Sequence, residues 1–64
     1  MRQPQLPLPT NRAFLVQFRA QPSGVPVGWE GRVEHIVSGQ VTHFASLEEL
    51  VAFMHHVLTE VAAQ

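Results

Sequence analysis

The sequence contains no cysteine, lysine, aspartate or tyrosine, and each absence narrows what the protein can do. Without cysteine no disulfide can form, which fits a reducing compartment. Arginine supplies all four basic residues and glutamate all five acidic residues, giving a formal net charge of −1. Because no basic cluster is present that could neutralise several phosphates, nucleic acid is disfavoured as a partner.

Long apolar runs are also missing. No stretch has the length of a signal peptide's apolar region or of a membrane-spanning helix. We therefore expect a soluble, cytoplasmic protein without a membrane partner.

The residue types that carry most enzyme chemistry form no persuasive set. Ser23, Ser38 and Ser46 lie in turn or helix-cap contexts, where serine has a structural role. The four glycines are scattered and form no phosphate-binding loop. The sequence predicts neither an enzyme nor a bound cofactor.

The chain is 64 residues long, which makes one small domain. A domain of this size buries only about 60% of the surface that its unfolded chain exposes. Small domains gain the missing stability from disulfides, metals or association. Since disulfides are excluded, metal binding and association are left.

Residues 47–62 form the only long segment with a helical period. Ser46 is placed to cap this helix, and Glu49 completes a capping box. The predicted buried stripe consists of Leu47, Leu50, Val51, Met54, Leu58 and Val61.

Phe53 and Val57 lie to one side of this stripe and widen the apolar arc beyond what one supporting sheet requires. We expect both side chains to project past the sheet and, together with Trp29, to form the contact of a dimer. The protein is therefore predicted to associate with itself or with another protein.

The residues before the helix predict three short strands at 13–20, 29–38 and 40–45. The fold class is α+β: a three-stranded antiparallel meander with the C-terminal helix on one face. Phe14, Val16 and Phe18 should face that helix. Residues 1–12 are rich in proline and read as a flexible arm, with a docking peptide as the less favoured alternative, and residues 13–64 form the domain.

The register of the second hairpin depends on its turn. A two-residue turn at Ser38-Gly39 places Val33 opposite Phe44 and Glu34 opposite His43. The inward face then carries Val33, Val37 and Phe44, and the outward face carries Arg32, Glu34, Ile36, Val41 and His43. A three-residue turn would set His35 opposite His43 instead.

Two alternative functions use residues named above. A histidine metal site shared between chains would draw on His35, His43, His56 and Glu60, of which the last two have helical i, i+4 spacing. A weak single-stranded nucleic-acid binder would use Arg19, Trp29 and Arg32, because aromatic platforms bind bases when basic side chains surround them.

The run from Trp29 to Gly39, followed by Phe44 to Phe53, resembles segments of short uncharacterised bacterial proteins with the order strand, turn, strand, helix. The resemblance implies a bacterial origin and an α+β fold. It implies no activity and no site residues. The sequence thus favours a non-catalytic association module, either a homo-oligomer with a dimer first or a small accessory subunit of a larger assembly.

Overall fold

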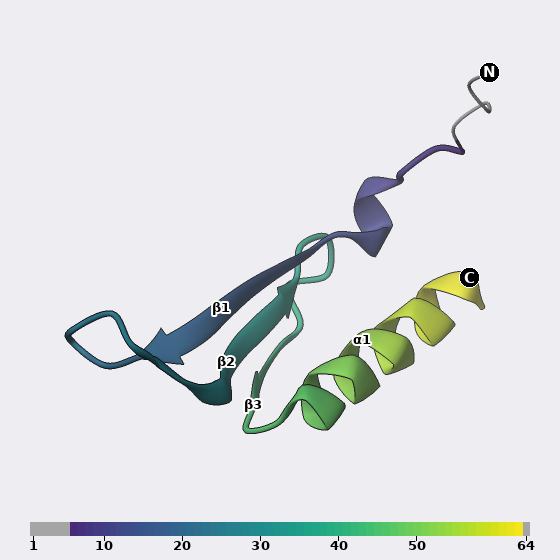
Figure 1. The fold of residues 1–64 in the computed structure, drawn as a ribbon. Coiled ribbons are helices and arrows are strands. Elements are labelled where there is room, and N and C mark those ends of the chain that lie inside the picture. The colour runs from purple at the N-terminus through teal and green to yellow at the C-terminus, as the bar shows by residue number, and fades with distance from the viewer. Residues whose placement is uncertain (1–5, 64) are drawn as a thin grey trace, which may run out of the picture.

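The computed structural model describes residues 6–63. The α+β class is confirmed: three antiparallel strands precede one C-terminal helix, as Figure 1 shows. Along the chain the elements are the 3-10 helix η1 (Thr10–Arg12), the strands β1 (Phe14–Ala20), β2 (Pro26–His35) and β3 (Val41–Phe44), and the helix α1 (Leu47–Ala62). The predicted bounds of the helix are confirmed, whereas β2 begins earlier than predicted.

β2 begins at Pro26 because the turn before it is short. Gly24 has a φ of +90°, and its N–H donates to the Gln21 carbonyl over 2.7 Å. The Gln21 N–H in turn donates to the Val25 carbonyl over 2.8 Å. Proline is tolerated at this point because β2 has a neighbour here on one side only, β1. The predicted connection over 21–28 is therefore a tight turn followed by strand.

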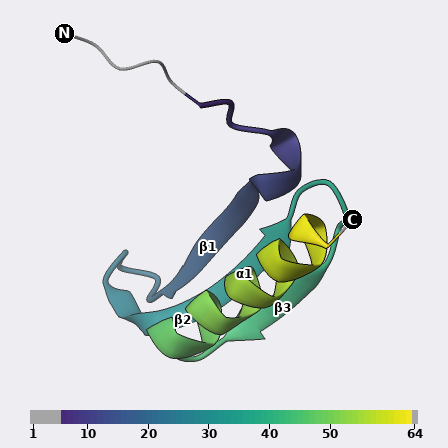
Figure 2. The ribbon, with the colours of Figure 1, turned by 90° about the vertical axis from the view of Figure 1, so that its right-hand side faces the viewer.

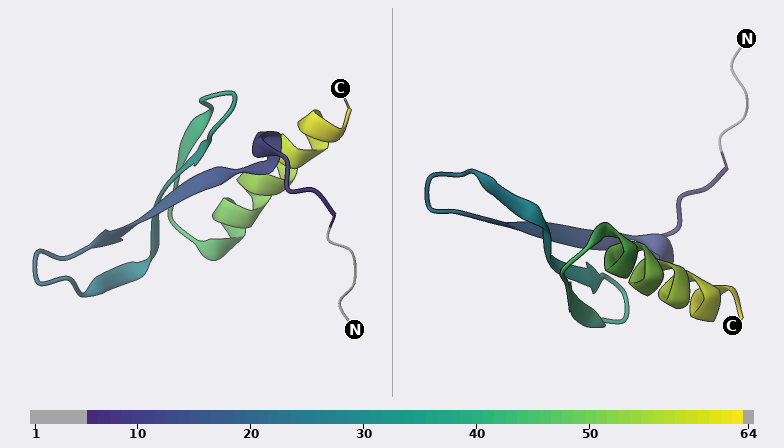
Figure 3. Two further views of the ribbon diagram at one scale, coloured as in Figure 1. Left: turned by 90° about the horizontal axis from the view of Figure 1, so that it is seen from above. Right: turned by 60° about the horizontal axis from the view of Figure 1, so that its bottom comes forward.

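The sheet has the order β1-β2-β3, which leaves β1 and β3 as its edges. β1 and β2 are longer than β3, so their hairpin extends beyond the part of the sheet that carries the helix (Figure 1; Figure 3). Figure 2 shows α1 lying over β2 and β3, with β1 running to one side. One face of β1 is therefore only partly covered.

Both predicted turn lengths of the second hairpin are wrong. The His35 N–H donates to the Gln40 carbonyl over 2.8 Å, which encloses four residues, and Gly39 has the positive φ of +76° that this turn needs. Val33 consequently lies opposite Thr42, and Phe44 lies opposite Gly31. The shift relative to the two-residue turn is two residues, which preserves the inward and outward faces.

The pairs across the outward face do change with this register. Arg32 lies opposite His43, and Glu34 lies opposite Val41, so the predicted pair of Glu34 with His43 is wrong. Val37 was expected to point inward, but it belongs to the turn and is exposed. Ile36 is exposed in the same turn.

The core is small. Its buried apolar residues are Val33, Phe44, Leu50 and Val57, and Phe14, Val16, Phe53 and Met54 pack around it. On α1 the buried positions Leu50 and Val57 are seven residues apart, with Phe53 and Met54 between them, which is one helical stripe. Leu47 and Val51, predicted to be buried, are 44% and 51% exposed.

The buried stripe differs from the predicted one because η1 packs against α1. This short helix comes from the proline-rich segment that the sequence analysis assigned to the arm. It supplies a surface on the flank of α1 that a three-stranded sheet alone would leave open. Val57 therefore lies in the core.

The predicted N-cap is confirmed. The Ser46 side-chain oxygen accepts a hydrogen bond from the Glu49 N–H at 3.2 Å. The Glu49 carboxylate accepts from the Ala45 N–H at 2.6 Å, one residue before the position that a standard capping box uses. These bonds begin the helix directly after the last strand.

Candidate functional site

An aromatic pair lies on the part of the first hairpin that extends past the helix. Trp29 and Phe18 are 52% and 50% exposed, and their ring centroids are 5.5 Å apart with the planes at 72°. Phe18 also contacts Phe44 edge to face at 5.8 Å, which links this pair to the core. The pair is thus held in place from behind while half of its surface faces solvent. Trp29 remains a candidate for a protein contact.

The other two predicted interface residues do not lie on the surface as expected. Val57 is 1% exposed and belongs to the core. Phe53 is half-buried, and its ring meets the ring of Phe14 at 6.4 Å and 77°. The prediction that both project past the sheet is wrong, because η1 and β1 cover this flank of α1. The large apolar side chains of α1 that are exposed are Leu47 and Val51 instead.

The free edge of β1 presents backbone groups. The Ile36 N–H donates to the Ala13 carbonyl over 3.1 Å, so the backbone groups of Ala13 point toward β2. Because this direction alternates along a strand, those of Phe14, Val16 and Phe18 point away from β2. β1 is the first strand in the sheet order, so no strand among residues 6–63 pairs with that side. Such an edge can accept a further strand.

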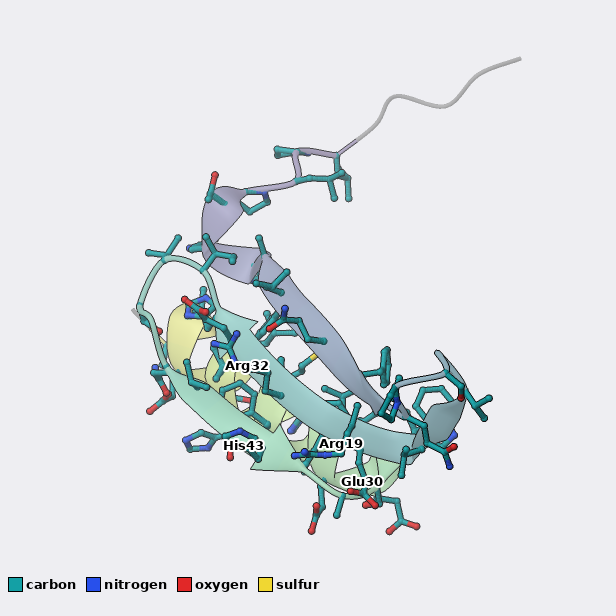
Figure 4. The ribbon with its side chains drawn as sticks, turned by 90° about the vertical axis from the view of Figure 1, so that its left-hand side faces the viewer. Arg19, Glu30, Arg32 and His43 are labelled. Atoms are coloured by element: carbon teal, nitrogen blue, oxygen red, sulfur yellow. The ribbon has the colours of Figure 1, made fainter. Side chains whose placement is uncertain are left out.

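The outward face of the sheet carries four polar side chains that Figure 4 labels, Arg19, Glu30, Arg32 and His43, with the helix behind the sheet. Arg19 and Glu30 form an ion pair at 3.7 Å between Nε and Oε1. Both side chains are largely exposed, so this pair adds little stability. An open hollow of about 270 Å³ lies between Arg19, Arg32 and His43.

Arg32 is held by two neighbours on the same face. One guanidinium nitrogen donates to the Glu34 carboxylate at 3.0 Å, and the other donates to the Gln17 side-chain oxygen at 2.6 Å. Both arginines of this face therefore have a carboxylate partner, and these two pairs leave no excess of positive charge. An anionic ligand would have to displace these contacts.

The residues of the nucleic-acid alternative do not form one surface. Arg19 and Arg32 lie on the outward face, whereas Trp29 contacts Phe18, whose ring meets the core residue Phe44 on the helix side. A base stacked on Trp29 would thus be separated from both guanidinium groups by the sheet. The geometry does not support this combination.

His35 has a structural role that the sequence did not predict. It is 2% exposed, and both ring nitrogens are engaged. Nε2 donates to the Asn11 carbonyl at 2.7 Å, since a carbonyl can only accept, and Nδ1 lies 2.7 Å from the Ser38 hydroxyl. Its ring also contacts Phe14 at 5.2 Å. His35 therefore ties η1, β2 and the turn after β2 together.

The histidines do not assemble a metal site within one chain. His35 faces inward and His43 outward, so the alternative register that would set them opposite each other does not occur. His56 and Glu60 do approach each other, at 3.6 Å on the exposed side of α1. Among residues 6–63 no group of three or more histidine, aspartate, glutamate or cysteine side chains is placed to hold a metal ion. One feature of the sequence does indicate that His35 is buried: it lies two residues after Val33 on a strand, so both side chains point to the same, inward face.

Comparison with protein-family models, curated protein sequences and solved structures finds no match to this chain. No helix in the described part of the chain is long and apolar enough to cross a membrane.

Proposed function

We propose that this chain is a non-catalytic association module that forms a homodimer. The observation that carries the proposal is the balance between buried and exposed apolar side chains: among the residues that the structure describes, four are buried in the core. Those left about half exposed or more are Leu6, Leu8, Leu15, Phe18, Val25, Trp29, Ile36, Val37, Val41, Leu47 and Val51. Scattered exposed apolar residues are normal, but adjoining aromatic ones such as Phe18 and Trp29 are typical of a contact surface.

The extended shape supports the same proposal. The radius of gyration is 14.5 Å, whereas a compact chain of this length would have about 11 Å. A folded chain with this elongated shape buries less of its own apolar surface than a compact chain of the same length. A second copy can supply what the chain lacks, and a closed twofold dimer is the commonest form of such self-association.

Light scattering coupled to size exclusion tests the proposal over a series of protein concentrations. We expect the mass of a dimer in the micromolar range. Replacing Trp29 by Ser should shift the mass toward the monomer, whereas replacing Val37 by Ser should not. Val37 is a matched control because it is also about half exposed but lies in the turn at the other end of the sheet. A monomeric parent at every concentration would overturn the homodimer.

Single-stranded nucleic acid is the weaker alternative, because Arg19 and Arg32 already pair with carboxylates. A titration with an oligothymidine at low and moderate salt separates the two functions. Phosphate contacts would give tight binding that weakens steeply with salt, whereas the proposed module should show no such binding. The bacterial origin and the cytoplasmic location stay predictions.

A further inference from the structure

We propose that two copies associate through β1, antiparallel about a twofold axis at Val16, to form one continuous six-stranded sheet. This inference rests on the proposed self-association and names the surface that carries it.

The backbone of β1 is complementary to a second copy of itself. Phe14, Val16 and Phe18 each direct an N–H and a C=O away from β2. In an antiparallel pair about Val16, these residues face one another in the hydrogen-bonded positions: Val16 meets Val16, and Phe14 meets Phe18 of the second copy. Every outward donor in this segment then has an acceptor.

The register follows from the irregularity near the end of β1. The pairing with β2 is regular from Phe14 to Phe18 and shifts between Phe18 and Ala20. A bulge of this kind bends the strand and interrupts its edge. The straight part of the edge is thus 14–18, and a twofold axis at its centre passes through Val16.

The side chains favour this pairing on both faces. On the helix side, Phe14 would lie opposite Phe18 of the second copy, an aromatic cross-strand pair that covers part of the exposed Phe18 ring. Trp29 supports this pair, because its ring packs on Phe18 at 5.5 Å. On the outward face, Leu15 would lie opposite Gln17. No charged residue lies between Phe14 and Phe18. The nearest charges, Arg12 and Arg19, would face alanines, so no like charges meet.

The opposite edge is a weaker candidate. β3 has four residues and is followed within three residues by the start of α1, which limits the strand that could pair with it. Strand pairing is stabilised residue by residue, so the longer free edge is the better surface. Short edge strands are also a common device against unwanted pairing.

Cysteine cross-linking tests the register, and the absence of native cysteine makes single variants unambiguous. The variants L15C and Q17C are purified separately, one of them with a larger tag, mixed and oxidised. Leu15 and Gln17 would face each other in a non-hydrogen-bonded pair, where the Cα atoms are about 4.5 Å apart, within the range for a disulfide. We expect the mixed disulfide well above its statistical share, and little disulfide from either variant alone.

Val41→Cys is the matched control partner for L15C, because Val41 is 45% exposed and Leu15 is 46% exposed, both on the outward face. Val41 lies on β3, so this mixture should give no preferred disulfide. Equal cross-linking with V41C would overturn pairing through β1, and a dominant disulfide of Q17C with itself would overturn the axis at Val16. A dimeric mass without the mixed disulfide would contradict this inference alone. A monomeric parent would contradict the proposed function as well.

Discussion

Gly31 lies where the backbones of β1 and β2 approach closely, and we predict that Gly31→Ala destabilises the fold. A Cβ atom built on Gly31 would overlap the carbonyl oxygen of Gln17 and lie 3.0 Å from the Cα atom of Phe18. These are backbone atoms of β1, so they cannot move aside as a flexible side chain would. Gly31 is also paired with Phe44 on its other side, so β2 cannot shift away without disturbing β3.

The size of the effect follows from this geometry. Forcing an extra methyl into a packed region usually costs about 1–3 kcal/mol. For a domain of 60–100 residues, each kcal/mol lowers the melting temperature by about 4–8 °C. Small domains lie at the low end of the usual stability of about 5–15 kcal/mol. We therefore expect a clearly lower melting temperature for Gly31→Ala.

Thermal unfolding followed by circular dichroism measures the melting temperature. The fluorescence of Trp29, the single tryptophan, reports on the surroundings of its ring. A displaced Phe18 would change the surroundings of the Trp29 ring, which lies 5.5 Å from it. Gly39→Asn is the control: a Cβ there meets nothing within 4 Å, and asparagine tolerates its φ of +76° better than most other side chains, so only a small backbone effect is expected. If Gly31→Ala melts like the parent, the close approach of β1 and β2 at Gln17 is not real.

Three further predictions concern the cap, the arm and the buried histidine. Ser46→Ala should destabilise the protein by about 1 kcal/mol, the usual effect of losing a good N-cap, and an unchanged melting temperature would mean that α1 begins elsewhere. Removing residues 1–8 should leave the melting temperature unchanged, because Leu6 and Leu8 are 85% and 96% exposed; loss of cooperative unfolding would contradict this. His35→Ala should destabilise by about 1–3 kcal/mol, because the Asn11 carbonyl loses its donor, while His43→Ala on the exposed outward face should have little effect.

The elements that depend on neighbouring residues were predictable from the sequence. Ser46 and the helical period fixed α1 because caps and periodicity act within one or two turns. The inward positions Val33 and Phe44 were also predicted correctly, although their partners were not. A register shift of two residues leaves the alternation of faces intact, so the hydrophobic pattern could not distinguish the two registers.

The features that depend on a particular side-chain contact, within a turn or between distant segments, were not predictable. The turn of four residues after His35 is held by the Ser38 hydroxyl, which also accepts from the Gln40 N–H at 3.2 Å. The burial of Val57 depends on η1, and the contact of η1 with the sheet runs through the Asn11 carbonyl, 24 residues from His35 in sequence. Prolines near the N-terminus predicted a flexible arm. No local pattern indicates that the last residues of this arm pack on the helix.

Gly31 connects the stability of the hairpin with the proposed dimer. It pairs with Phe18, the last regular residue of the β1 edge, and the bulge follows directly after that pair. The regular part of the free edge therefore ends at the residue that pairs with Gly31. If two copies pair through this edge, their association stabilises the folded chain by mass action. A side chain at position 31 would then weaken the hairpin and the dimer together, since both depend on the same short stretch of β1.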